Sequence, residues 1–348
     1  MKKYKNVTFL TVATLTKERS MVEYQKLNPS FYLRLPFLQT AFASIKFRVS
    51  GELLRKHSKF QLITTRNQAK LLGSYAEQAH AKGLIVLLHG WEGGIESTYM
   101  LRTGQYMFRN GYNVYRLNLR DHGNTHHLNE MPFNGTLIDE TYDALVQISK
   151  LAGNLPVYLV GFSLGGNFVL RIAMKHSKSP KREKINRLQH VLGISPAVDP
   201  RRATERIDAD FLLGPHFLNQ WSNSLRKKAE LFPYLFDFNF LWSARSVLEL
   251  TELAIQSFLP FKDANEYFQK YTVTGSFFKG LKVPTTIYSS ADDPIITEDD
   301  FNRIDDNSLL RIIMTDRGGH NGFLINGFWP AYLDLLDQII KDNVVSKQ

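Results

Sequence analysis

One short stretch, GFSLGG at residues 161–166, constrains the fold of this chain more than any other. It follows an apolar run at 156–160 and precedes an amphipathic stretch at 167–176, which predicts a strand, a sharp turn and a helix. A G-x-S-x-G turn strains the backbone at its serine, and the flanking glycines let the strand and the helix pass closely. The bare motif also occurs in ordinary Gly/Ser turns, but these neighbours favour Ser163 as a nucleophile.

Apolar runs and helical periods alternate along most of the chain. This alternation predicts a mostly parallel, doubly wound sheet with helices on both faces. Ahead of it, residues 60–64 and 71–76 predict two antiparallel strands around a turn. The expected parallel strands are 83–88, 112–117, 156–160, 191–194, 284–288 and 310–314, and the expected helices include 137–151 and 328–342.

The 348 residues, 43% of them apolar, suit one large domain with an insertion. We expect a basic arm at 1–56, weakly structured to residue 28 and helical from 29, and a core in two parts, 57–198 and 272–348. Residues 199–271 lack a strand pattern and predict a helical lid, whose aromatic residues either form its own small core or line a pocket. These residues are Phe211, Trp221, Phe232, Tyr234, Phe236, Phe238, Phe240, Trp242, Phe258 and Phe261.

The net charge of +10 is concentrated at the amino terminus. Residues 1–70 contain 14 Lys and Arg against 3 Asp and Glu, so the rest of the chain is nearly neutral. The arm therefore predicts either a solvated basic face packed on the domain, which we favour, or peripheral contact with an anionic membrane. We expect no nucleic-acid partner, because no nucleic-acid-binding module accompanies the charge. With no cysteine and no apolar run long enough to span a membrane, we expect a cytoplasmic protein, with membrane association as the alternative.

A serine nucleophile needs a base and a carboxylate. His320, in RGGHNGF at 317–323, follows the last predicted strand and is the candidate base. The loop SADDP at 290–294 follows the preceding strand and supplies the candidate acid. Asp293 is preferred over Asp292 because Pro294 favours an extended conformation at the residue before it. The other aspartate would then cap the turn.

An oxyanion hole is the remaining requirement. We expect one donor from the backbone N–H of Leu164, at the start of the helix after the serine. The second should be the N–H of Trp91, in the loop HGWEGG at 89–94. His89 is expected to lie beneath this loop and to hold it by hydrogen bonds, a structural role.

Taken together, these motifs resemble the YheT-type branch of the α/β-hydrolases. The resemblance includes LPFLQT at 35–40, LHGWEG at 88–93, LRDHG at 119–123 and the serine, aspartate and histidine loops. It implies a serine hydrolase acting on carboxylic esters, with Ser163, Asp293 and His320 as nucleophile, acid and base. We expect a small-molecule ester substrate, with a short- to medium-chain acyl or lipid-like part, and no cofactor. Trp91 stands where a smaller aliphatic residue is frequent, a difference that would narrow the acyl side of the pocket.

Three alternatives stay open at this stage. Asp121, His122, His126 and His127 are residue types that suit zinc or iron, although a structural loop is the favoured interpretation. The same triad could transfer the acyl group to an alcohol rather than to water. The fold could also serve a catalytically silent binding protein, which the intact triad residues disfavour.

Overall fold

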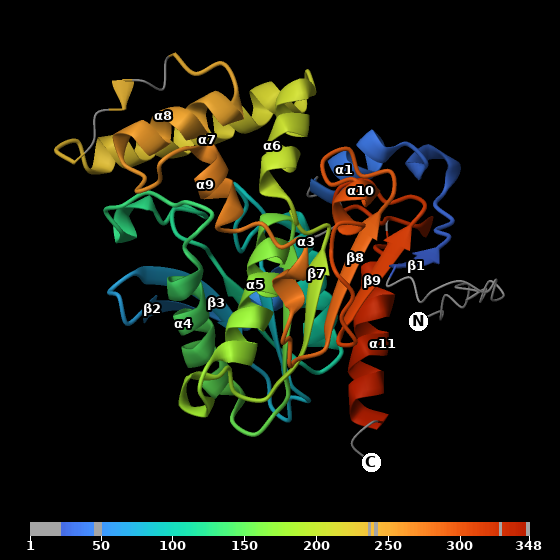
Figure 1. Ribbon diagram of the computed structural model, residues 1–348. Helices are drawn as coiled ribbons and strands as arrows, with labels where there is room; N and C mark the ends of the chain where they lie inside the picture. The colour runs from blue at the N-terminus through green and yellow to red at the C-terminus, as the bar shows by residue number, and fades with distance from the viewer. Residues whose placement is uncertain (1–21, 45–50, 236–237, 240–242, 327–328, 346–348) are drawn as a thin grey trace.

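A nine-stranded, mostly parallel sheet forms the centre of the protein in a computed structural model (Figure 1). The structure describes residues 22–44, 51–235, 238–239, 243–326 and 329–345. The strand order is β1-β9-β8-β7-β6-β4-β5-β3-β2, with β3 antiparallel to both β2 and β5. The strands are β1 Val22–Gln25, β2 Ser58–Thr64, β3 Lys70–Ala76, β4 Leu84–Leu88, β5 Asn113–Leu117, β6 Val157–Phe162, β7 Leu188–Ile194, β8 Thr285–Ser290 and β9 Leu310–Thr315. The predicted fold class and the predicted antiparallel pair are confirmed.

Helices cover both faces of the sheet, as the alternation predicts (Figure 1). Along β4, Leu84, Val86 and Leu88 belong to the core beneath α4 and α5, whereas Ile85 and Leu87 belong to the core beneath α3 and α11. A continuous apolar run is therefore required, because this strand is buried on both sides. The helices are α1 Pro36–Ser44, α2 Glu52–Lys56, α3 Thr98–Arg109, α4 Ile138–Ser149, α5 Leu164–Lys178, α6 Pro200–Ala209, α7 Leu213–Leu231, α8 Val247–Ser257, α9 Ala264–Gln269, α10 Glu298–Phe301 and α11 Tyr332–Val345.

The amino-terminal segment is more ordered than the sequence predicts. Residues 22–25, expected to be weakly structured, form β1 and pair in parallel with β9 at the sheet edge. Glu23 forms an ion pair with Arg311 of β9 at 2.7 Å. This order comes from tertiary pairing, which the short segment does not reveal on its own. The rest of the segment predicted to be weakly structured before it, residues 1–21, lies outside the described residues, as do residues 45–50 of the arm.

The segment between β7 and β8 is helical, and its helix starts follow from side-chain caps. Asp199, Ser246 and Asp263 each accept a hydrogen bond from the backbone N–H three residues later, which begins α6, α8 and α9. We call residues 199–271 the insertion. Not all of its aromatic residues are internal: Phe211 is 83% exposed and Tyr234 is 73% exposed. The predicted lid residues Phe236, Phe240 and Trp242 lie outside the described residues.

Within the described ranges, none of the helices combines the length and the apolar character that crossing a bilayer requires. The insertion lies over the carboxyl ends of the central strands, and α1 lies near the ends of β8 and β9 (Figure 1). The loops that carry the candidate site residues emerge at this same edge of the sheet.

Candidate active site

Ser163 occupies the sharp turn between β6 and α5. Its backbone has φ 52° and ψ −115°, a sparsely populated conformation that costs roughly 1–3 kcal/mol for a residue with a side chain. A Cβ atom at Gly161 would lie 2.1 Å from the carbonyl oxygen of Gly165, so the first glycine of the motif is a steric requirement. The strained turn places the serine side chain at the carboxyl edge of the sheet.

The structure brings the three predicted triad residues together in one hydrogen-bonded series. His320 Nε2 lies 2.9 Å from Ser163 Oγ, and His320 Nδ1 lies 2.9 Å from Asp293 Oδ2. The other oxygen of Asp293 accepts the N–H groups of Ile295 and Ile296 at 2.8 and 3.0 Å. Asp293 is buried, and its three contacts, with His320, Ile295 and Ile296, fix its orientation.

Asp292 has a different place from Asp293. Its Oδ1 accepts the backbone N–H of Gly319 at 2.8 Å, so it holds the histidine loop rather than the histidine ring. The sequence predicted that the second aspartate would cap its own turn, and the contact with Gly319 corrects that detail. Of the two neighbouring carboxylates, it is Asp293 that contacts the ring.

This arrangement also selects a tautomer for His320. A carboxylate accepts hydrogen bonds only, so the proton on the imidazole belongs on Nδ1, facing Asp293. The lone pair of Nε2 then faces the hydroxyl of Ser163, which can donate its proton there. The geometry allows proton removal from the serine and stabilises the imidazolium that results.

The loop after β4 lies beside the serine. His89 is buried beneath it, with Nδ1 2.7 Å from the carbonyl oxygen of Gly90 and Nε2 accepting the N–H of Leu119 at 3.0 Å. Burial lowers the pKa of His89 to about 3, so the ring is neutral. Its two contacts hold the loop in place, the structural role that the sequence predicts. Trp91 and Leu164, the expected oxyanion donors, both line the pocket that contains Ser163. Leu164 begins α5, where backbone N–H groups lack helical partners.

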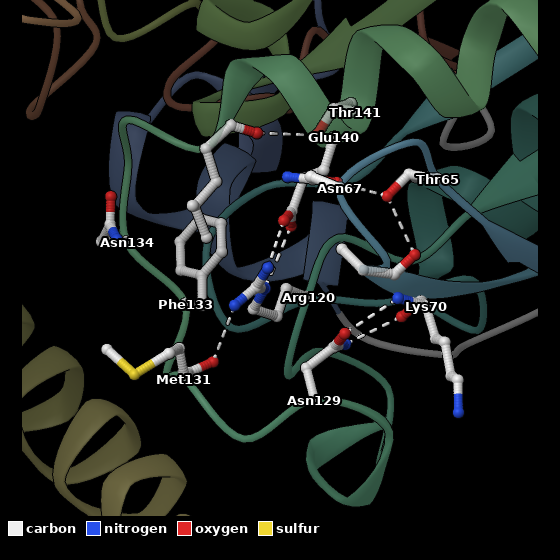
Figure 2. A network of polar contacts seen from close by, with 12 residues as sticks. Thr65, Asn67, Lys70, Arg120, Asn129, Met131, Phe133, Asn134, Glu140 and Thr141 are labelled. Atoms are coloured by element: carbon white, nitrogen blue, oxygen red, sulfur yellow. Dashed lines mark hydrogen bonds and ion pairs between the residues drawn. The ribbon is translucent and has the colours of Figure 1, made fainter.

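The loop after β5 is held by a network of polar contacts. Arg120 lies between Glu140 of α4 and the carbonyl oxygen of Met131 (Figure 2). Asn129 pairs with both backbone groups of Lys70 at 2.8 Å (Figure 2). The network ties this loop to β3 and α4.

The possible metal ligands in the same loop have other partners. Asp121 contacts Lys228, His122 Nδ1 lies 2.7 Å from the carbonyl oxygen of Arg120, and His126 Nε2 lies 2.8 Å from Ser224 Oγ. His127 is exposed. Across the part of the chain that the structure describes, no group of three or more such side chains is arranged to hold a metal ion.

An apolar pocket of about 100 Å³ extends from Ser163 and His320 beneath the insertion. The ring of Trp91 stacks on Phe217 at 5.3 Å and meets Trp221 edge-on at 5.7 Å, both on α7. The insertion therefore packs directly on the loop that carries an expected oxyanion donor. The remaining lining includes side chains of α6, α8 and α9, which are Pro200, Ala203, Thr204, Ile207, Val247, Thr251, Tyr267 and Phe268.

Sequence reasoning missed one wall of this pocket, formed by residues 133–135. Its backbone is fixed from two sides: Arg171 donates to the carbonyl oxygen of Gly135 at 2.6 Å, and the N–H of Gly135 donates to the hydroxyl of Tyr267 at 2.9 Å. Arg171 is buried, and burial lowers its pKa to about 10, so it remains charged at neutral pH. No local motif marks this loop, and only the fold brings it to the serine.

Comparisons with known proteins agree with this geometry. Residues 83–224 match a protein-family model described as the alpha/beta hydrolase fold. The chain has the α/β-hydrolase fold. A search of curated proteins finds no match.

Solved structures of α/β-hydrolases are similar over most of the chain. The Pyrococcus furiosus esterase Pf2001 has 15% identity and a TM-score of 0.55, with 92% of this chain and 98% of that chain covered. The 2,6-dihydroxy-pseudo-oxynicotine hydrolase has 14% identity and a TM-score of 0.53, with 87% and 70% covered. At these identities the similarity concerns the fold, and the YheT-type branch stays a prediction.

Proposed function

We propose that the protein is a serine hydrolase that cleaves carboxylic esters through an acyl-enzyme. One observation carries the proposal: Ser163, His320 and Asp293 form a continuous hydrogen-bonded series, with both links at 2.9 Å, at the base of an apolar pocket. The esterase among the structural neighbours is consistent with this chemistry.

The proposed reaction follows from the contacts. Ser163 Oγ attacks the ester carbonyl while its proton passes to His320 Nε2. The N–H groups of Trp91 and Leu164 would bind the oxyanion, each such donor contributing roughly 3 kcal/mol. The alcohol then leaves with the proton from His320. Water, activated by the same imidazole, attacks the acyl-enzyme and releases the acid.

The pocket indicates a hydrocarbon acyl chain. It has a volume of about 100 Å³ and leads from Ser163 and His320. The walls are mainly aliphatic and aromatic, which favours a hydrocarbon chain over a sugar or a charged group. We therefore propose esters with short- to medium-chain acyl groups.

The test is hydrolysis of p-nitrophenyl esters from acetate to palmitate by the native chain and by Ser163→Ala. Ser257→Ala is the matched control, because the Ser257 hydroxyl only contacts the carbonyl of Leu253 within α8. We expect the first variant to lose activity, the control to retain it, and the optimum to fall among the short- to medium-chain esters rather than at palmitate. A native chain that neither hydrolyses these esters nor reacts with a fluorophosphonate probe would favour the silent binding protein.

Acyl transfer remains a second possibility with the same triad. The partition depends on whether water or an alcohol reaches the acyl-enzyme first, and the apolar pocket walls would also admit a small alcohol. Product analysis with added ethanol separates the two: ethyl esters indicate transfer, and free acid alone indicates hydrolysis.

Peripheral contact of the arm with an anionic membrane is a further proposal. Within the described part of the arm, Phe31, Leu35 and Phe37 are 79%, 61% and 58% exposed. They accompany the excess of basic residues in the first 70 positions. Exposed apolar side chains beside cations are typical of interfacial segments.

A further inference from the structure

The helix α1 of the arm contacts the loop that carries His320. The hydroxyl of Thr40 accepts the backbone N–H of His320 at 2.9 Å. The same hydroxyl donates to the carbonyl oxygen of Pro36, one turn earlier in α1, also at 2.9 Å. Donation to Pro36 orients the hydroxyl, so its lone pair is directed to the histidine.

Gln39 holds the other end of the same loop. Its side chain is fully buried and uses both ends of its amide. Nε2 donates to the carbonyl oxygens of Leu33 and Leu324 at 2.7 and 2.9 Å, and Oε1 accepts the N–H of Leu324 at 2.7 Å. Residues 320 and 324 are thus both bound to consecutive residues of α1.

The packing between α1 and the loop leaves no free space. Gly319 has φ +54°, and a Cβ atom there would lie 2.5 Å from the carbonyl oxygen of Pro36 and 2.8 Å from Thr40 Oγ1. A residue with a side chain would force the helix and the loop apart. The glycine before the histidine therefore serves the contact with α1.

We propose that Gln39 and Thr40 are positioning residues for His320. The inference rests on the proposed function, because it concerns the base of that reaction. The backbone N–H of His320 is anchored by Thr40, and the ring must keep two 2.9 Å contacts at once, to Ser163 and Asp293. A shift of about 1 Å in a reacting group can reduce the rate by about 100-fold.

This assignment gives the arm a role that its charge does not predict. The arm is joined to the site by hydrogen bonds between residues about 280 positions apart, such as Thr40 and His320. Gln39 and Thr40 contact the loop backbone and not the pocket, so their loss should change kcat more than KM.

The experiment compares Thr40→Val with Thr40→Ser and Thr141→Val. Valine keeps the shape of threonine and removes the hydroxyl. Thr141, on α4 (Figure 2), is a matched control, because its hydroxyl also bonds the carbonyl four residues earlier, that of Leu137. We expect kcat to fall about 10- to 100-fold in Thr40→Val with KM changed less than about twofold. Thr40→Ser should restore most of the rate, and Gln39→Leu should lower kcat in the same direction.

The outcomes separate this inference from the proposed function. If Thr40→Val is folded and its kcat matches that of Thr141→Val, the positioning role is wrong. If the native chain is inactive and does not react with the fluorophosphonate probe, the function proposal fails. Amide hydrogen exchange of residues 317–324 then tests whether Thr40 holds the loop. Exchange should be faster in Thr40→Val than in the native chain and in Thr141→Val, and equal exchange would overturn the inference.

Discussion

Replacing Lys228 by methionine should destabilise the protein, because it leaves a buried carboxylate without its cation. Lys228 is fully buried on α7, and its Nζ lies 2.7 Å from Asp121 Oδ1. It also donates to the carbonyl oxygens of His126 and Asn129, while the second oxygen of Asp121 accepts the N–H of Phe133. The lysine therefore joins the insertion to the loop after β5 by three contacts.

The expected magnitude follows from this burial. Burial raises the pKa of Asp121 and lowers that of Lys228, so desolvation offsets much of the attraction between them. Removing one partner of such a pair typically costs about 3–5 kcal/mol. With an unfolding entropy of about 2.1 cal/mol/K per residue, the 348-residue chain should lose roughly 4–7 °C in Tm. Removing both charges, in Lys228→Met with Asp121→Asn, should cost less than the single change.

Chemical denaturation followed by fluorescence, together with calorimetry, measures these differences. Lys227→Met is the matched control, because Lys227 is the exposed neighbour on the same helix, and its change should stay within about 0.5 kcal/mol. The destabilisation in Lys228→Met should shrink as the pH falls, since the folded state holds a proton on Asp121 more tightly than the unfolded state does. A Lys228→Met protein within about 1 kcal/mol of the control would refute the reasoning.

Three further predictions concern the site and the arm. Asp293→Asn should lower kcat by about 10⁴, because an amide does not select the Nδ1–H tautomer; ester hydrolysis with Ser163→Ala as the baseline measures this. Burial raises the pKa of Glu92 to about 8, so the contribution of Glu92 to the stability of the native chain should fall as the pH rises from about 4.5 to 8. In Glu92→Gln this loss should be absent, so the Tm of the variant relative to that of the native chain should be higher at pH 8 than at pH 5. The same Tm difference at both pH values would contradict the prediction. Changing Phe31 and Phe37 together to serine should weaken sedimentation with phosphatidylserine vesicles, and unchanged sedimentation would exclude the aromatic contact.

The positions of most strands and the triad were predictable because each follows from a local signal. A buried parallel strand requires an apolar run, and the carboxyl ends of such strands meet at one edge. The loops after β6, β8 and β9 therefore had to converge, and Ser163, Asp293 and His320 lie on them. Within those loops, the glycine motif identified the serine, and the proline after Asp293 identified the aspartate.

The features that were missed depend on pairing between distant segments. β1 has only four residues and is ordered by β9, and no periodicity of its own predicts it. The contact of Thr40 with His320 spans 280 positions, and that of Lys228 with Asp121 spans 107. LPFLQT at 35–40 contributes to the family resemblance, but only the fold shows which groups Gln39 and Thr40 contact. No sequence motif marks such residues, because their side chains bind backbone groups of a distant segment, and every residue type has those groups.

The two contacts of α7 determine how the pocket can open. Lys228 fixes the carboxyl-terminal end of the helix by its buried charge, and Phe217 and Trp221 hold the ring of Trp91 nearer the amino-terminal end. Separating the apolar rings from one another requires no buried charge to lose its partner. We therefore expect substrate entry to displace the amino-terminal end of α7, next to the exposed Phe211 that precedes the helix. In that case Trp91 would lose its contacts with Phe217 and Trp221 while the roof of the pocket moves away, and both contacts would return when α7 closes over the acyl chain.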